Sequence, residues 1–402
     1  MRKRGVIWMV VTLIILLDLY VFQIIKSVSQ EASSHARIII YSAWWAVSAI
    51  AILLFALLPL LFDPRNPPRI RNYLFAALIA FFLGKLLAAV FFLVDDIRRL
   101  IQWTTGPKGI PRSFTLSWLG LGIGTTLFSS LIYGFSNKYK YQVKKVRLSF
   151  ANLPAGFRGL KIIQLSDIHS GSFADRAAVA RGVDKVLAEK PDLILFTGDL
   201  VNDIATEMKD YAAIFARLKA PMGVFSTLGN HDYGDYTWWE TPEHKKANLD
   251  YLKQIQHDMG WRLLMNEHVV LERGGDQIAL LGIENWSAKA RFPKYGKMGE
   301  AHAGTEKYPF KILMSHDPSH WDAEVRPHYP DIDLALAGHT HGMQFGIEIP
   351  GLKWSPVQYA YKQWAGLYEE GRQKLYVNRG YGFIGYPGRV GILPEITVIE
   401  LV

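Results

Sequence analysis

Seven side chains in the C-terminal two thirds of the chain are of types that bind divalent metal ions, and they occur in short, ordered groups. Asp167 and His169 are two residues apart, as are His339 and His341. In an extended chain the side chains of residues i and i+2 project to the same side, so each pair can present two ligands to one cavity. The other three candidates are single residues, namely Asp199, Asn230 and His316.

The donor atoms of this set are oxygens and nitrogens, which suit borderline-to-hard divalent ions. The chain contains no cysteine, which excludes thiolate zinc sites, disulfides and cysteine nucleophiles. Seven donors are too many for one tetrahedral site. With one bridging carboxylate they fill two adjacent sites, an arrangement in which two cations about 3.5–4 Å apart clamp a phosphoryl group. The residue types therefore indicate two-metal phosphoryl chemistry.

The polar groups each follow a predicted buried strand. Strands are predicted at 160–165, 193–196 and 223–228, with amphipathic helices between them, which gives a β-α-β-α-β order. The helix patterns are Val179, Val183 and Val186, and then Met208, Tyr211, Phe215 and Leu218. Open α/β sheets place their sites at the carboxyl ends of strands. Further strands are predicted at 278–283, 310–314, 332–336, 375–378 and 396–401.

The ordered blocks over residues 141–402 resemble those of the calcineurin-like metallophosphoesterases, and the edges of the domain resemble the membrane-anchored bacterial branch. The matching blocks are Asp167-Ile168-His169, Gly198-Asp199, Gly229-Asn230-His231-Asp232, His316 and Gly338-His339-Thr340-His341. Two residues depart from the pattern of many relatives: Asn202 replaces an Asp, and Met343 replaces a second Gly. Neither departure removes a ligand, so both bear on substrate shape and not on metal binding.

The resemblance implies a four-layer α/β/β/α sandwich with two divalent cations, for which Mn, Fe, Zn and Mg are candidates. The first ion would be held by Asp167, His169, Asp199 and His341, and the second by Asp199, Asn230, His316 and His339. His231 would lie beside the phosphate as a transition-state stabiliser or proton donor, oriented by Asp232. The implied reaction is in-line attack on phosphorus by a hydroxide that bridges the metals, without a covalent enzyme intermediate.

Two further groups of residues have both a plain and a functional interpretation. Four aromatic residues follow the Asn-His-Asp block, and they either pack an insertion or form an apolar wall for a lipid or nucleoside portion: Tyr233, Tyr236, Trp238 and Trp239. Four basic residues lie either in a solvated loop or beside a second phosphate or an anionic membrane surface: Lys289, Arg291, Lys294 and Lys297.

The N-terminal third contains four apolar runs, at 6–25, 38–62, 73–94 and 114–135, each with about the 20 residues that a membrane-spanning helix needs. The first run is longer than the apolar core of a signal peptide, so we expect it to be retained. Gly120 and Gly124 form a G-x-x-x-G pair that favours close helix packing. Asp18 and Lys85 lie at the same depth of two helices that run in the same direction, which predicts an ion pair inside the bilayer. The alternative is that Lys85 extends alone towards the membrane surface and Asp18 is protonated.

These patterns predict a transmembrane four-helix bundle (1–137), a basic juxtamembrane linker with the first strand (138–150) and a metallophosphoesterase domain (151–402). The flanks on the N-terminal side of the membrane contain eleven Lys and Arg residues, among them Arg65. The loops on the opposite side contain six, among them Lys108. This bias predicts a multi-pass protein of the inner (cytoplasmic) membrane with a cytoplasmic catalytic domain. The net charge of +9 comes from residues beside the apolar runs, so we expect no nucleic-acid partner.

The predicted function is a membrane-anchored phosphodiesterase or pyrophosphatase acting on a phospholipid-like or lipid-linked substrate, with the lipid bilayer as its partner. A soluble substrate, such as a cyclic nucleotide or a phosphoprotein, uses the same metals and stays open. A non-catalytic membrane sensor or scaffold is the alternative from another class, and the complete ligand set argues against it. A transporter is disfavoured because Asp18 and Lys85 are the only ionisable residues well inside the apolar runs.

Overall fold

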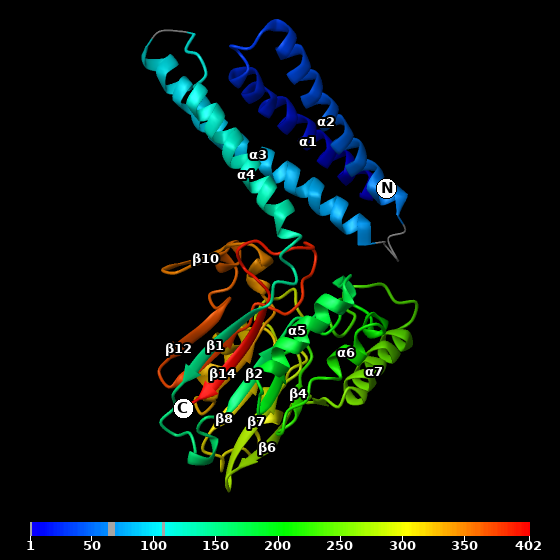
Figure 1. The fold of residues 1–402 in the computed structure, drawn as a ribbon, viewed down its shortest axis with the longest axis vertical. Coiled ribbons are helices and arrows are strands. Elements are labelled where there is room, and N and C mark those ends of the chain that lie inside the picture. The colour runs from blue at the N-terminus through cyan, green and yellow to red at the C-terminus, as the bar shows by residue number, and fades with distance from the viewer. Residues whose placement is uncertain (1, 63–68, 107–108) are drawn as a thin grey trace. The chain divides into compact units, whose positions relative to one another are not determined.

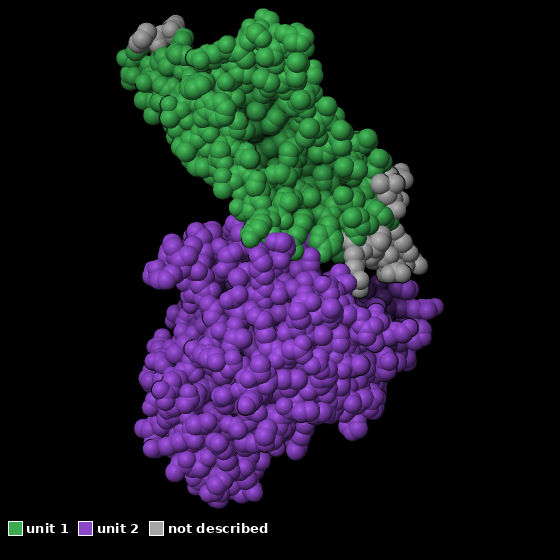
Figure 2. Space-filling model, in the orientation of Figure 1, with its two compact units in different colours: residues 1–135 green, residues 136–402 purple. Residues whose placement is uncertain are grey.

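The computed structural model describes residues 2–62, 69–106 and 109–402 (Figure 1). The chain divides into two compact units, residues 1–135 and 136–402, which are coloured separately in Figure 2. Each unit is described by itself. Arg65 and Lys108, two of the basic residues behind the predicted orientation, lie outside the described residues.

The first unit consists of four helices that are long and apolar enough to cross a membrane, as predicted. They are α1 (Arg2–Val28), α2 (Ser34–Leu61), α3 (Arg69–Thr105) and α4 (Phe114–Gly134). Helix α3 continues well past Val94, where its apolar run ends.

Ion pairs explain why α3 continues beyond the apolar run. Asp95 accepts hydrogen bonds from Arg98 Nε (2.9 Å) and from the backbone amide of Ser113 (3.0 Å). Asp96 forms an ion pair with Arg112 (2.6 Å). Hydropathy marks the end of the apolar run, whereas these local partners allow the polar turns that follow to stay helical.

Glycines bring α3 and α4 into backbone contact. A Cβ atom on Gly124 would lie 2.4 Å from the carbonyl oxygen of Gly84, and one on Gly120 would lie 3.0 Å from that of Ala88. These distances leave no room for a larger side chain, so the predicted role of the G-x-x-x-G pair in close helix approach is confirmed.

The predicted pairing of Asp18 with Lys85 is also confirmed. The Lys85 ammonium donates to an Asp18 carboxylate oxygen and to Ser48 Oγ (2.8 Å), and all three side chains are buried. The ammonium also lies 4.5 Å from the centroid of the Trp44 ring. The pair thus joins α1 to α3, with a hydroxyl from α2 as third partner.

Either single replacement, Asp18→Asn or Lys85→Met, is expected to destabilise the membrane unit by about 3–5 kcal/mol, because it leaves one buried charge without its partner. Exchanging the two residues restores the pair and should recover much of this loss. Thermal unfolding of the full chain in lipid nanodiscs measures both effects. An exchange variant no more stable than the single variants would contradict an energetic role for the pair.

The second unit contains two six-stranded sheets. The first has the order β1 (Gln142–Leu148), β14 (Glu395–Leu401), β2 (Lys161–Leu165), β3 (Leu193–Phe196), β4 (Val224–Ser226) and β5 (Arg262–Leu263). The second has the order β12 (Gly366–Glu370), β13 (Gln373–Val377), β9 (Leu334–Ala337), β8 (Lys311–Met314), β7 (Asp276–Gly282) and β6 (Glu267–Arg273). A separate hairpin pairs β10 (Ile347–Ile349) with β11 (Leu352–Trp354).

The helices of this unit are short apart from α5 and α7. They are α5 (Arg176–Ala188), α6 (Ala212–Phe215), α7 (Pro242–Asp258), α8 (Met298–His302) and α9 (Arg326–His328). Single helical turns also occur, at η1 (Ala155–Phe157), η2 (Ser170–Ser172), η3 (Ala205–Met208), η4 (Trp321–Val325), η5 (His341–Gln344) and η6 (Pro356–Tyr359).

Alternation along the strands produces the layers. In β2, Ile163 packs in a cluster with α5, α6 and α7, whereas its neighbour Ile162 packs against the second sheet. In β7, Leu280 belongs to that cluster between the sheets, whereas Leu281 packs with α8 and η4 on the outer face. Because successive side chains point to opposite faces, each sheet is covered on both sides. The predicted four-layer α/β/β/α sandwich is therefore confirmed.

One predicted helix is wrong. The spacing of Met208, Tyr211, Phe215 and Leu218 predicts a continuous helix, but the structure has η3 and α6 with a turn between them. All four side chains are buried in the same cluster. Helical spacing therefore shows that they face one core, which two consecutive turns achieve as well as one helix.

Candidate metal centre

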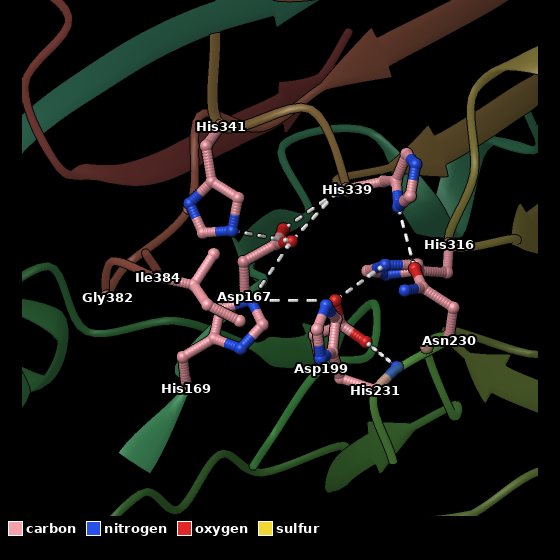
Figure 3. Close-up of polar contacts among 12 residues, drawn as sticks. Asp167, His169, Asp199, Asn230, His231, His316, His339, His341, Gly382 and Ile384 are labelled. Atoms are coloured by element: carbon pink, nitrogen blue, oxygen red, sulfur yellow. Dashed lines mark hydrogen bonds and ion pairs between the residues drawn. The ribbon is translucent and has the colours of Figure 1, made fainter. Parts of the chain in front are cut away.

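The seven predicted ligands converge at the carboxyl ends of five strands of the two sheets (Figure 3). They follow β2, β3 and β4 in the first sheet, and β8 and β9 in the second. Two groups have ligand atoms within 4.8 Å of one another: Asp167, His169 and His341, and Asp199, His316 and His339. The structure thus brings together residues up to 174 positions apart in the sequence.

Asp199 lies between the two groups. Its Oδ2 atom is 3.5 Å from His169 Nε2, on one side, and 3.1 Å from His316 Nε2, on the other. Asn230 adjoins the second group, with its Oδ1 atom 2.8 Å from His339 Nδ1. One carboxylate therefore faces ligands of both groups, the position that a bridging residue requires.

Backbone strain is concentrated at these residues. Positive φ angles occur at five of the seven candidates, namely Asp167 (53°), His169 (48°), Asp199 (61°), His339 (69°) and His341 (51°). A non-glycine residue in this region costs of order 1–3 kcal/mol, and such strain gathers at functional sites because the surrounding structure imposes it. Met343, at the position where the family resemblance leads us to expect Gly, also has a positive φ of 55°, the conformation in which glycine is favoured.

Glycines next to the candidates permit the close approach of the loops. Gly198 has a φ of 97°, and a Cβ atom there would lie 2.5 Å from the backbone nitrogen of Gly229. A Cβ atom on Gly338 would lie 1.9 Å from Ser166 Oγ. The Gly-Asp and Gly-His pairs of the sequence therefore have a steric reason, since a larger residue would push the strand-end loops apart.

The charges of the site are those of a cation-binding centre. Burial alone would raise the pKa of Asp167 and Asp199, but neighbouring histidines, chiefly His341 and His316 respectively, lower the pKa of both below the usual range. Burial lowers the pKa of His169 well below its ordinary value. Ionised carboxylates and neutral imidazoles are the forms that bind metal ions.

His316 differs from the other histidines. Burial would lower its pKa, but Asp199 outweighs that effect and raises the pKa of His316 to about 10. A cation bound at Nε2 has to replace this proton, so metal binding at this group releases a proton and weakens as pH falls.

Orphaned nitrogen atoms provide a test of whether these residues fit metal ions. Nε2 atoms of His169, His316 and His341 are buried and form no hydrogen bond of good geometry to any described group. Those of His316 and His341 lie 3.1 Å and 3.3 Å from carboxylate oxygens of Asp199 and Asp167. Buried polar atoms are nearly always satisfied, so this set of nitrogens and carboxylates is suited to further partners between them. Divalent cations fit this set of nitrogen and oxygen donors.

His231 lies beside the two groups, and its ring is held differently from the prediction. Its Nδ1 atom is 2.7 Å from the carbonyl oxygen of Asn202. The carboxylate of Asp232, the expected orienting group, instead accepts hydrogen bonds from four backbone amides, those of Asp199, Leu200, Val201 and Gly229. Asp232 therefore fixes the loop that carries Asp199, and the backbone of Asn202 orients His231.

The four predicted aromatic residues occupy different environments. Tyr236 contacts the site: its hydroxyl accepts a hydrogen bond from Asn230 Nδ2 (3.0 Å), which turns Oδ1 of that amide towards His339. Tyr233 is buried, and its hydroxyl donates to Glu284 (3.3 Å) and accepts from the backbone amide of Asn285 (3.1 Å). Trp239 donates to the carbonyl of Gly234 (2.7 Å) within its own segment. Trp238 is exposed. None of the four lines the cavity described next.

A cavity of about 360 Å³ opens over the candidate ligands. Part of its wall is apolar and comes from segments that the sequence did not single out, chiefly Phe292, Pro356, Val357, Ala360, Tyr361 and Ile384, with Met343 beside them. Ile384 lies next to His169 and His341 (Figure 3). Of the four basic loop residues, Arg291 lines the cavity. The local sequence does not indicate that these residues line a cavity, because they belong to no motif and come together only in the folded chain.

Asp317 positions His339, and no motif in the sequence indicates this role. Its Oδ2 atom is 3.5 Å from His339 Nε2 and accepts a hydrogen bond from the Tyr361 hydroxyl (3.3 Å), which itself lies 2.8 Å from His339 Nε2. A carboxylate at this position favours a proton on Nε2 and leaves the Nδ1 lone pair for a cation.

Asp317→Ala is expected to weaken metal binding at the second group by about 10–100-fold, the usual loss for a carboxylate that orients a metal-binding histidine. Asp317→Asn keeps an oxygen acceptor and should lose less. Titration of the metal-free full chain with Mn²⁺, alongside thermal unfolding, separates affinity from stability. A metal titration unchanged in both variants would leave Asp317 with a structural role alone.

Comparison with known proteins agrees with this geometry. The family model "Probable Calcineurin-like phosphoesterase, transmembrane domain" matches residues 2–138, and "Calcineurin-like phosphoesterase" matches residues 160–343. The "Uncharacterized metallophosphoesterase YkuE" of Bacillus subtilis is 30% identical over 252 residues, which cover 62% of this chain and 81% of that protein.

Two other relatives have names that refer to a membrane or to a lipid. A "Transmembrane protein with metallophosphoesterase domain" of Danio rerio is 32% identical over 279 residues, 67% of this chain and 60% of that protein. The "UDP-2,3-diacylglucosamine pyrophosphatase LpxG" of Chlamydia muridarum is 27% identical over 288 residues, 60% of this chain and 84% of that protein. With its four membrane helices, the chain belongs to the membrane-anchored calcineurin-like metallophosphoesterases, metal-dependent hydrolases of phosphoric ester or phosphoanhydride bonds.

Proposed function

We propose that this protein hydrolyses a phosphodiester or pyrophosphate bond in a phospholipid-like or lipid-linked substrate at the membrane face. The observation that supports this most directly is the pairing of two groups of metal-binding side chains with a cavity whose wall is apolar in part. The apolar part offers a surface for the hydrophobic portion of a lipid, which a small polar phosphoester would not need. The Chlamydia relative is named for a pyrophosphatase activity on a diacylated sugar nucleotide.

In this proposal Asp167, His169 and His341 hold one divalent cation, and His316, His339 and Asn230 hold the other. Asp199 serves both cations, in line with the short distances from its Oδ2 atom to histidines of both groups. When bound, the cations supply Lewis-acid activation of water and neutralise charge on the phosphoryl oxygens.

His231 acts as the proton donor to the leaving oxygen. A carbonyl oxygen can only accept, so the contact with Asn202 keeps a proton on Nδ1 and leaves Nε2 as the atom that exchanges a proton with the substrate. His231 lines the cavity, so Nε2 has access to the reacting group. Arg291, on the same cavity, provides a fixed positive charge for a phosphoryl oxygen.

The apolar wall accommodates the hydrophobic part of the substrate. Val357, Ala360 and Ile384 have no polar side-chain atoms and line the cavity together with Met343. We further propose that the domain lies on the cytoplasmic side of the inner membrane, on the basis of the Lys and Arg bias of the membrane flanks.

A substrate and metal screen tests this function. The purified full chain is stripped with a chelator and assayed after addition of Mn²⁺, Fe²⁺, Zn²⁺ or Mg²⁺. The substrates are bis-p-nitrophenyl phosphate, p-nitrophenyl phosphate, a cyclic nucleotide and a lipid pyrophosphate in mixed micelles. We expect metal-dependent turnover of the diester and the lipid pyrophosphate, with the highest kcat/KM for the lipid.

Other outcomes of the screen identify the alternatives. Higher kcat/KM for the cyclic nucleotide or the monoester would overturn the lipid assignment and keep the hydrolase. Metal binding without turnover of any of the four substrates would favour a membrane sensor or scaffold that has kept the fold.

A further inference from the structure

The β10–β11 hairpin has an amphipathic pattern of unusual orientation. Its register pairs Ile347 with Trp354 and Ile349 with Leu352, so these four side chains share one face. The middle pair, Glu348 and Lys353, occupies the other face. In the described part of the chain the hairpin joins neither six-stranded sheet.

The polar face of the hairpin is turned towards the domain. Glu348 accepts from Lys144 Nζ of β1 (3.2 Å) and from Arg379 Nη2 (2.6 Å). Lys353 Nζ donates to the carbonyl oxygen of Ala365 (2.6 Å). These three contacts attach the hairpin through charged and polar groups, so its orientation is fixed by the domain itself.

Three of the four side chains on the apolar face are left outside, whereas Trp354 is half-buried. Ile347, Ile349 and Leu352 are 45%, 58% and 49% exposed. Two neighbours along the chain are also exposed, Met343 (56%) and Tyr359 (80%). A half-exposed sheet in water normally turns its apolar side inward, whereas this hairpin exposes three apolar side chains and turns Glu348 towards the domain. Clustered exposure of this kind marks an interaction surface.

The surface borders the mouth of the candidate active site. The hairpin lies between two segments that line the cavity, one with His341 and Met343 and the other with Pro356 and Val357. Figure 1 shows β10 projecting at one end of the domain. Whatever covers this face therefore also lies beside the entrance to the site.

The chain brings this end of the domain close to a bilayer. The last membrane helix ends at Gly134, and three residues later Asn137 Nδ2 donates to the carbonyl oxygen of Arg389 (3.1 Å). Three residues span about 10 Å at most. Arg389 in turn donates to the carbonyl oxygen of His341 (3.2 Å), at the start of the segment that leads into the hairpin. Two hydrogen bonds thus link Asn137, three residues after the last membrane helix, to the segment that leads into the hairpin.

We propose that the apolar face of the β10–β11 hairpin, with Met343 and Tyr359, inserts into the interfacial region of the lipid bilayer. The lipid surface provides an apolar layer for Ile347, Ile349 and Leu352, and a Tyr at its edge suits the boundary between headgroups and acyl chains. Lys138 and Lys140, which follow the last membrane helix directly, favour an anionic lipid surface at the same end of the chain. This surface goes beyond the proposed function and does not depend on which phosphoester is hydrolysed.

Site-directed fluorescence tests the proposal without any assay of activity. The chain has no cysteine, so Ile349→Cys and Leu352→Cys each introduce a single labelling site for an environment-sensitive nitrobenzoxadiazole dye. Tyr251→Cys on α7, a residue 52% exposed, is the matched control. The labelled full chain is reconstituted in vesicles of phosphatidylethanolamine and phosphatidylglycerol. Some vesicles contain lipids with a spin label about 5–10 Å below the headgroups, the depth of an interfacial segment.

We expect emission at shorter wavelength and strong quenching by the spin-labelled lipid at positions 349 and 352, and water-like emission with little quenching at position 251. Thermal unfolding of each labelled variant confirms that it is folded, and agreement between the two hairpin positions excludes a local effect of one label. Water-like emission at both hairpin positions would overturn the proposal. A blue shift that spin-labelled lipid does not quench would also overturn it, since another protein surface would then cover the face.

Discussion

Asp199→Asn is expected to remove nearly all hydrolysis and to reduce the bound metal from two equivalents to one or fewer. Asp199 is the only candidate ligand whose carboxylate oxygen lies within 3.5 Å of histidines of both groups in the described chain. The amide has the same shape but lacks the negative charge that balances two divalent cations. Removal of a single stabilising donor typically lowers kcat by about 10²- to 10³-fold, and the decrease in kcat here should be larger.

The fold should survive this substitution. Asp199 Oδ1 accepts a hydrogen bond from the backbone amide of His231 (2.8 Å), and the side-chain oxygen of an asparagine can do the same. The matched control is Asp333→Asn, a buried carboxylate whose oxygens accept from the backbone amide of Lys311 (2.9 Å) and from Asn152 (2.9 Å) outside the site. Elemental analysis, kcat on bis-p-nitrophenyl phosphate and thermal unfolding separate metal loss from unfolding. Near-normal turnover of Asp199→Asn with any of the four metals would contradict a shared carboxylate.

The ligand set could be predicted from the sequence because each ligand directly follows a strand. Asp167 and His169 come after β2, and His339 and His341 after β9, so strand topology alone brings them to one edge. The apolar runs of β2 and β7 fit strands that are buried on both faces, whereas the four layers themselves are expected from the family resemblance. At these residues the local sequence pattern and the position in the folded domain agree.

Contacts made by loops across the fold could not be predicted in this way. Asp232 follows His231 in the chain, so sequence order favours it as the orienting group, but its carboxylate binds the backbone of the Asp199 loop 32 residues away. Tyr361 meets Asp317 across 44 residues. Such pairs depend on how long connections pack, which no hydrophobic period encodes.

The hairpin illustrates a third case, in which the sequence shows which residues share a face but not whether that face points to the domain or away from it. No strand is predicted at 347–349, although Ile347, Glu348 and Ile349 alternate as in a strand with one apolar side, which in water normally faces inward. Only the ion pairs of Glu348 with Lys144 and Arg379 show that the charged side faces the domain. A sequence pattern fixes which residues share a face, whereas the partners of that face fix where it points.

His231→Ala is expected to lower kcat by about 10²- to 10⁴-fold, the range typical of a positioned proton donor, while the metal content stays at the wild-type value. The reason is geometric, since His231 lines the cavity and its Nδ1 is occupied by the carbonyl of Asn202. The side chain therefore has one nitrogen, Nε2, for the substrate. As a proton donor it assists the leaving oxygen, so its loss should matter less when that oxygen leaves readily.

Leaving groups of different basicity distinguish proton donation from simple charge stabilisation. A proton donor predicts a small defect for a p-nitrophenyl diester and a much larger defect for an alkyl diester, whereas a charge stabiliser predicts similar defects for both. His268→Ala is the matched control, because His268 Nδ1 also lies near a backbone carbonyl, that of Ala301 (3.1 Å), but outside the site. Loss of one metal equivalent in His231→Ala would make this residue a ligand. In that case the contact with Asn202 would orient a metal-binding imidazole, and the proton for the leaving oxygen would have to come from another group on the cavity wall.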